Sequence, residues 1–109
     1  MTTIDRQTFD NLKQMSGEEF INELIDTFLD DAPKLAKEIH DAQDADSFRR
    51  AAHSLKSNAA TFGATRLAEL AKGLEMLGRE NRLTDAGDQL SLLDEAVKSA
   101  CEALEGLKS

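Results

Sequence analysis

Residues 48–63 read Phe-Arg-Arg-Ala-Ala-His-Ser-Leu-Lys-Ser-Asn-Ala-Ala-Thr-Phe-Gly and predict a helix that ends at Gly63, a common left-handed stop. The apolar residues of this segment recur three and four positions apart, so they share one helical face. They are Phe48, Ala51, Ala52, Leu55, Ala59 and Phe62. At about 100° per residue, His53 falls roughly 140° from the centre of that stripe. We therefore expect His53 to face solvent from a helix that is buried on its other side.

The predicted solvent-facing side of this helix combines cations with small side chains around His53. Lys56 lies one turn after His53, and Arg49 lies one turn before it. Ser57 and Ala60 are small, so they leave the ring accessible to a bulky partner. A nucleophilic nitrogen has to be neutral and exposed, and a cation is then needed to hold the charge that it acquires. This surrounding makes His53 a candidate nucleophile.

The rest of the chain predicts four more helices. They run from Asp5 to Met15, from about Gly17 to about Ala42, from about Ala64 to Arg79 or Glu80, and from about Asp88 to Leu107. Apolar residues recur at helical spacing in each segment, and the connections are short. The sequence therefore predicts an all-α fold with one domain over residues 1–109. We expect an antiparallel up-down-up-down four-helix bundle, with the short N-terminal helix as a lid.

Several residues indicate where these helices begin or change direction. Asp5 is suited to cap the first helix, and Asp44 or Asp46 to cap the helix of His53. Ser16–Glu19 has the Ser-x-x-Glu pattern of a capping box, which predicts the start of the long helix. Pro33 lies inside that long helix and removes one backbone donor, so we expect a bend or a split there.

The apolar stripes also predict which side chains form the core. In the first helix, Phe9 and Leu12 share a face, with Ile4 and Met15 at its ends. The main stripe of the long helix is predicted to contain Phe20, Leu24, Phe28, Leu35 and Ile39, and it is widened by Ile21, Ile25, Leu29 and Ala32. Cys101 falls on the apolar face of the last helix, which favours a packing role over a redox role.

The overall composition restricts the partners of the chain. Its 109 residues carry a net charge of −8, which disfavours nucleic acid and anionic membrane surfaces. A lone cysteine excludes an intrachain disulfide, and there is no apolar run for a signal peptide or a membrane span. We therefore expect a cytoplasmic protein. The Met1 start and the full set of helices favour a free-standing protein, although a domain of a hybrid kinase would have the same pattern.

The motif around His53 resembles the histidine-containing phosphotransfer (HPt) domains of bacterial phosphorelays. The residues that carry the resemblance are His53-Ser54-Leu55-Lys56-Ser57, Gly63-Ala64, Leu67, Leu70 and Leu74-Glu75. The family pattern is approximately Ala-His-x-Leu-Lys-Gly, then a glycine ten residues after the histidine, then a leucine-rich helix that contains Leu-Glu. Ser57 departs from this pattern, because the family usually has glycine there. Serine is still small enough to leave the ring accessible.

The resemblance implies a phosphorelay intermediate. His53 would take a phosphoryl group through Nε2 from the aspartyl phosphate of a receiver domain and pass it to a second receiver aspartate. Lys56 would stabilise that group, and Arg49, Ser57 and Ala60 would lie under the docked receiver. The expected partners are response-regulator receiver domains and a hybrid sensor histidine kinase. We expect a monomer without a cofactor of its own, because the receiver would bring the Mg²⁺. The chain has no phosphate loop or kinase signature, so it should not use ATP.

Three other classes of protein require sequence features that this chain lacks. A helix-turn-helix DNA reader needs an apolar residue where Glu69 stands. A di-iron bundle needs Glu-x-x-His pairs, but Lys37 and Arg50 lie three residues before His40 and His53. A serine hydrolase of the nucleophile-elbow type needs Gly-x-Ser-x-Gly, which is absent. A bundle that binds a receiver or a partner helix without chemistry remains an open alternative.

Three features receive no role in this chemistry. His40 has no comparable surroundings and is predicted to be an ordinary surface histidine. Gly73 lies inside a helix, where it either permits close helix approach or leaves room near His53. One further group is predicted to form a solvated, salt-bridged helix face without chemistry. Its members are Glu69, Lys72, Glu75 and Arg79.

Overall fold

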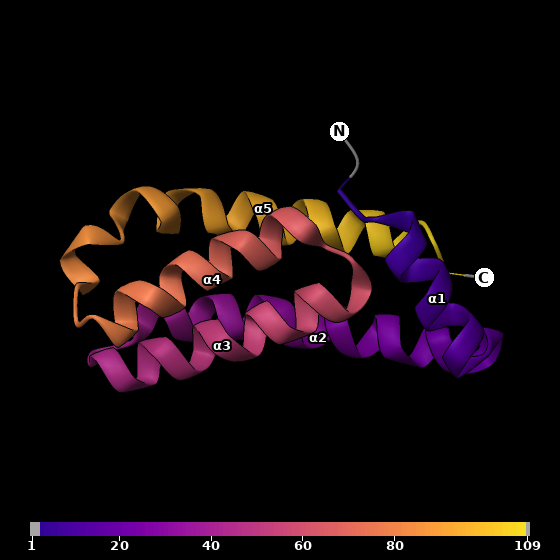
Figure 1. Cartoon of the computed structure of the whole chain (residues 1–109), viewed down its shortest axis with the longest axis horizontal. Coiled ribbons are helices and arrows are strands. Elements are labelled where there is room, and N and C mark those ends of the chain that lie inside the picture. Colours follow the sequence, from indigo (N-terminus) through magenta and orange to yellow (C-terminus); the bar gives the residue numbers. More distant parts are fainter. Residues whose placement is uncertain (1–2, 109) are drawn as a thin grey trace.

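Five α-helices and one short 3₁₀ helix make up residues 3–108, the part of the chain that the computed structural model describes (Figure 1). The α-helices are α1 (Arg6–Ser16), α2 (Glu18–Asp41), α3 (Ala45–Phe62), α4 (Thr65–Arg79) and α5 (Gly87–Glu105). The 3₁₀ helix η1 (Leu83–Asp85) interrupts the predicted loop between α4 and α5. No strand occurs within residues 3–108, so the all-α prediction is confirmed.

Helices α2 to α5 form the predicted antiparallel bundle. Helix α2 packs on α3 and α5, and α4 also packs on α3 and α5. Helices that follow one another in the chain are therefore neighbours in space, and the contact of α2 with α5 closes the ring. Helix α1 lies across one end of the bundle, against α2 and α3 (Figure 1). The described chain measures 42 × 25 × 18 Å.

The core contains apolar side chains from all five α-helices. Phe28 of α2 and Phe62 of α3 meet edge to face, with their ring centroids 5.2 Å apart. Burying a side chain of this size stabilises a fold by about 1.5–3 kcal/mol. The largest fully buried side chains are Phe9, Phe28, Ile21, Ile25, Ile39, Leu55, Leu67, Leu74, Leu93 and Leu104. These contacts hold α3, which carries His53, in a fixed position.

Both ends of α3 are held as the sequence predicts. The Asp44 carboxylate accepts a hydrogen bond from the backbone N–H of Ser47 at 2.8 Å, so Asp44 caps the helix. Gly63 ends the helix in the left-handed conformation, with φ at 79°. Its carbonyl accepts a hydrogen bond from the N–H of Asp5 at 2.7 Å. The N-terminal segment is therefore tied to the turn between α3 and α4.

The predicted capping box at the start of α2 is wrong. Ser16 is the last residue of α1, and its hydroxyl donates to the carbonyl of Leu12 at 2.8 Å. Gly17 precedes α2 with φ at 91°, and this backbone conformation makes the turn that leaves Ser16 in the preceding helix. Asp5 does precede α1, but its carboxylate accepts the hydroxyl of Thr8 and no backbone N–H.

Three further predictions about the first half of the chain need correction. Of the two outcomes expected at Pro33, the split is wrong, because α2 is continuous from Glu18 to Asp41. Met15 and Phe20 are not core residues, since they are 86% and 51% exposed. Phe20 lies outside the buried face of α2, so its ring remains in solvent. The buried residues of α2 are Ile21, Ile25, Phe28, Ala32, Ala36 and Ile39.

Candidate functional site

His53 stands on the solvent side of α3, as the stripe predicts, with its side chain 56% exposed. Its Nδ1 lies 2.7 Å from Oε2 of Glu75, which comes from the neighbouring helix α4. The buried apolar faces of α3 and α4 pack together directly. This packing brings the carboxylate of one helix beneath the imidazole of the other.

Glu75 is the centre of a charged cluster. Its side chain is only 4% exposed, and among the described residues it is the one buried polar or charged side chain. Oε1 accepts a hydrogen bond from Nζ of Lys56 at 2.7 Å, while Oε2 also lies 3.4 Å from Nη2 of Arg79. Both carboxylate oxygens are therefore occupied by donors, which offsets the desolvation of a buried charge.

These donors keep Glu75 ionised. The hydrogen bond from Lys56 is the main cause that lowers the pKa of Glu75, and the His53 contact lowers it further. Burial opposes them, but the pKa of Glu75 still lies below its ordinary value. An ionised carboxylate can only accept, so Nδ1 of His53 must carry the proton that it donates. The lone pair of a neutral imidazole is then on Nε2.

The other predicted site residues lie on α3 around this cluster. Lys56 is half-buried beside His53, since both side chains bind the same carboxylate. Ser57 and Ala60 are exposed, as expected for a surface that a partner would approach. Arg49 is half-buried and donates to Asp46 at 3.0 Å, so its guanidinium is engaged at the start of the helix. Hence the structure joins Lys56 to the His53 cluster and leaves Arg49 outside it.

The prediction that Glu75 belongs to a solvated helix face is wrong. The sequence signal compatible with its burial is the spacing of Glu75, which directly follows Leu74 and lies four residues after Ala71 and three before Gly78. An acidic residue on the edge of an apolar stripe, with cations on the facing helix, indicates a buried ion pair. Glu69 and Lys72, by contrast, are exposed as predicted.

Two other residues without an assigned role also have defined surroundings. A Cβ on Gly73 would lie 3.1 Å from the side-chain nitrogen of Gln89 in α5. Gly73 therefore faces α5, and its missing side chain does not create space beside His53. His40 is exposed, and its Nε2 lies 3.1 Å from Oδ1 of Asp94 in α5. That pair belongs to the α2–α5 side of the bundle, whereas His53 and Glu75 belong to the α3–α4 side.

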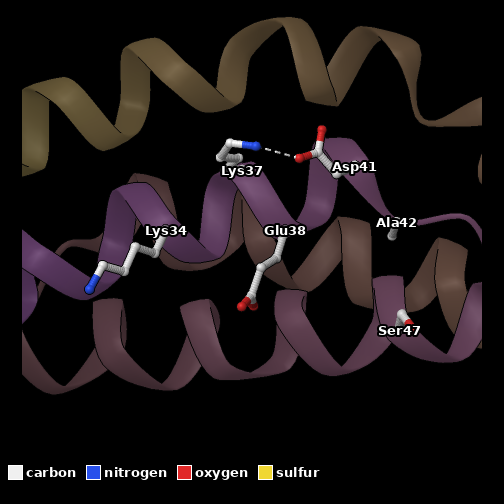
Figure 2. A pocket seen from close by; sticks show the side chains of 6 residues that line it. All are labelled: Lys34, Lys37, Glu38, Asp41, Ala42 and Ser47. Carbon is white, nitrogen blue, oxygen red and sulfur yellow. Dashed lines mark hydrogen bonds and ion pairs between the residues drawn. The ribbon is translucent and has the colours of Figure 1, made fainter.

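The surface also contains shallow grooves away from His53. One groove, of about 500 Å³, is lined by Lys34, Lys37, Glu38, Asp41, Ala42 and Ser47. Figure 2 shows Lys37 paired with Asp41, at 2.7 Å, while Lys34 and Glu38 point away from that pair. No charged groups converge there on a ligand position. Within residues 3–108, no three potential metal ligands among His, Cys, Asp and Glu are grouped to hold an ion. Over the same residues, no helix is both long and apolar enough to cross a membrane.

An antiparallel helical bundle with an exposed histidine on one of its central helices is the arrangement expected of a histidine phosphotransfer domain. The Hpt domain family model matches residues 23–106, so the chain belongs to the Hpt domain family. It is a histidine phosphotransfer intermediate, and proteins of this family carry phosphoryl groups rather than act as kinases.

Two known proteins show how far the similarity extends. The chain is 28% identical over 91 residues to the phosphorelay protein LuxU of Vibrio harveyi, and the aligned region covers 81% of this chain and 80% of LuxU. Its fold is similar to the crystal structure of histidine-containing phosphotransfer protein B from Pseudomonas aeruginosa PAO1. That comparison has a TM-score of 0.89 and 25% sequence identity, and covers 97% of this chain and 94% of the other. The four-helix arrangement is therefore shared along nearly the whole chain.

Proposed function

We propose that His53 is the phosphorylated residue of a phosphorelay intermediate. It accepts a phosphoryl group from the aspartyl phosphate of one receiver domain and passes it to the aspartate of another. The observation that carries this proposal is the contact of Nδ1 with the buried Glu75 carboxylate, because in a neutral ring this contact places the lone pair on the exposed Nε2. His40 differs, because its Nε2 is the atom that faces an acidic partner.

The proposed transfer uses Nε2 of His53 as the nucleophile. The lone pair on Nε2 forms a bond to phosphorus while the bond from phosphorus to the aspartate oxygen breaks, and the free carboxylate leaves with that electron pair. The Nδ1 proton stays on the ring and in its hydrogen bond to Glu75. The positive charge that the ring acquires therefore lies against a buried carboxylate. Attack by a second receiver aspartate on the same phosphorus reverses these steps.

Lys56 is the proposed stabiliser of the transferred group. One of its three N–H donors binds Glu75, so two remain for phosphoryl oxygens. While His53 is neutral, the cluster of Glu75, Lys56 and Arg79 carries one net positive charge, which favours an incoming anion. Positioning and charge neutralisation supply most of the catalysis in phosphoryl transfer. The receiver would contribute the Mg²⁺ at its own aspartate.

The proposed partners are receiver domains of response regulators and of a hybrid sensor histidine kinase. A receiver has to approach Nε2 over the exposed face of α3, where Ser57 and Ala60 offer little obstruction. Arg49 lies one turn before His53 on the same helix and would contact the rim of the docked receiver. We propose that the chain acts as a monomer, since one copy supplies the whole His53 cluster.

The direct test is to incubate the chain with a receiver phosphorylated on its aspartate, in Mg²⁺ buffer. We expect phosphate to appear on the chain in an acid-labile, base-stable form, which is the behaviour of a phosphoramidate. The phosphate should then move to a second, unphosphorylated receiver. Binding of the receiver without any labelling of the chain would contradict the proposal and favour a scaffold bundle without chemistry.

A further inference from the structure

The two glycines inside α4 have different surroundings. A Cβ on Gly78 would lie 3.1 Å from the N, Cα and Cβ atoms of Arg49 in α3. Two of these are backbone atoms of a packed helix, which cannot rotate aside as the end of a side chain can. Glycine is a poorer helix residue than alanine, so it has a cost at this position. In return, the absence of a side chain at Gly78 lets α4 lie directly against the backbone of α3.

This close contact lies next to the bond between His53 and Glu75. Gly78 is three residues after Glu75, and Arg49 is four residues before His53. In two antiparallel helices these two pairs are about one turn apart. The bond from Nδ1 to Oε2 is 2.7 Å long, and hydrogen bonds weaken once the distance exceeds about 3.2 Å. The present bond is at the short end of the hydrogen-bond range, and a separation of the helices by a few tenths of an ångström at Gly78 would move it towards the long, weaker end of that range.

We propose that Gly78 is a positioning residue for the phosphotransfer histidine. By allowing α4 to approach α3, it keeps the Glu75 carboxylate within reach of Nδ1. It thereby maintains the tautomer in which Nε2 of His53 carries the lone pair. The consequence for phosphoryl transfer rests on the proposed function of His53, whereas the consequence for the tautomer does not.

Gly73 provides a matched control in the same helix. A Cβ at that position would meet only the side chain of Gln89, whose amide nitrogen is 3.1 Å and whose Cδ is 3.8 Å away. The Gln89 side chain can rotate, and it belongs to α5 rather than to α3. Gly73→Ala thus makes the same change of residue type in the same helix without pressing on α3.

The experiment compares Gly78→Ala with Gly73→Ala. Nitrogen-15 spectra of the imidazoles, recorded on the unphosphorylated protein, report which ring nitrogen carries the proton, and His40→Gln assigns the two histidines. We expect His53 to be mainly the Nδ1–H tautomer in the wild type and in Gly73→Ala. In Gly78→Ala the Nε2–H tautomer should increase several-fold. Transfer from a phosphorylated receiver should slow by about 3–10-fold in Gly78→Ala, because small misplacements reduce rates steeply.

Equal tautomer populations and equal rates in the two alanine variants would overturn the proposal. If Gly78→Ala does not fold, Glu75→Asp tests the same distance, since it withdraws the carboxylate by one methylene and leaves the contact with Arg49 intact. A wild-type tautomer in Glu75→Asp would then overturn the proposal. Phosphorylation of His53→Gln at the wild-type level would instead contradict the proposed function, and it would leave the tautomer result standing.

Discussion

At the scale of single residues, the state of His53 depends on Glu75. An exposed histidine alone does not select which of its nitrogens reacts, because either tautomer is available in water. The buried carboxylate makes that selection, and Lys56 and Arg79 make its burial possible by occupying the same two oxygens. The proposed nucleophile His53, the carboxylate of Glu75 and the cation of Lys56 are thus held in one cluster that spans α3 and α4.

Lys56→Ala should impair transfer without unfolding the bundle. A charge-assisted hydrogen bond contributes about 1.5–3 kcal/mol, so its loss should slow transfer or shorten the lifetime of the phosphohistidine by about 10–150-fold. Glu75 would still be bound by His53 and Arg79. Rapid-quench transfer assays and the decay of the isolated phosphoprotein measure both effects, with Lys72→Ala as the control on α4. Unchanged rates in both directions, with an unchanged lifetime, would show that Lys56 is only a surface charge.

Glu75→Gln should remove part of the acid sensitivity of the fold. The pKa of Glu75 is lowered from its ordinary value of 4.5, so the unfolded chain binds more protons in the window just below that value. The stabilisation is therefore complete above about pH 4.5 and is lost as the pH falls through the lowered pKa. We expect the variant to be less stable by about 1–3 kcal/mol at pH 7. Denaturant unfolding at several pH values should show this difference shrinking below pH 4.5; a constant difference would contradict it.

Much of the site was predictable from the sequence, and the rest depends on contacts between helices. The stripe of α3 predicts that His53 faces outward, because a helix has a fixed period. The hydrogen bond between His53 and Glu75 depends on which face of α4 packs against α3, and no local sequence pattern specifies that face. For the same reason the sequence left two roles open for Gly73, and it gave His40 no partner although Asp94 lies beside it.

At the scale of elements, the predicted helix ends are correct where a single residue type fixes the backbone conformation or caps the helix. Asp44 caps α3 through its carboxylate, and Gly63 ends α3 in a conformation that disfavours other residues. The capping box at Ser16 failed because the positive φ of Gly17 places the turn one residue later. Ser16 and Gly17 each indicate a helix boundary, one residue apart, and the packing of α1 on the bundle decides between them.

Ala60→Trp tests which face of α3 meets the partner. Ala60 is exposed two turns after His53, so an indole there should obstruct a receiver while changing stability by no more than about 0.5 kcal/mol. We expect an almost unchanged melting temperature but strongly weakened receiver binding and transfer. Glu95→Trp, at an exposed position of α5, is the bulky control, and Ser57→Gly should be tolerated. Wild-type binding and transfer by Ala60→Trp would show that the receiver docks elsewhere.

At the scale of the whole molecule, charge is distributed unevenly around the bundle. Residues 45–79, which include α3 and α4, contain six Lys and Arg side chains against three Asp and Glu side chains. The remainder of the chain contains seven against eighteen. In an acidic protein, His53 thus lies in a segment with an excess of basic side chains. This asymmetry favours approach of an anionic aspartyl phosphate to the α3–α4 side and disfavours approach to the α2–α5 side.

The most direct test of the phosphorelay role compares the two histidines in one assay. Wild type, His53→Gln and His40→Gln are each incubated with the same phosphorylated receiver, and acid-labile, base-stable phosphate on the chain is measured over time, with circular dichroism to confirm equal helicity. We predict that His53→Gln accepts no phosphate and that His40→Gln accepts it at the wild-type rate. Labelling of His53→Gln to the wild-type level would contradict the assignment of His53 as the phosphoryl carrier.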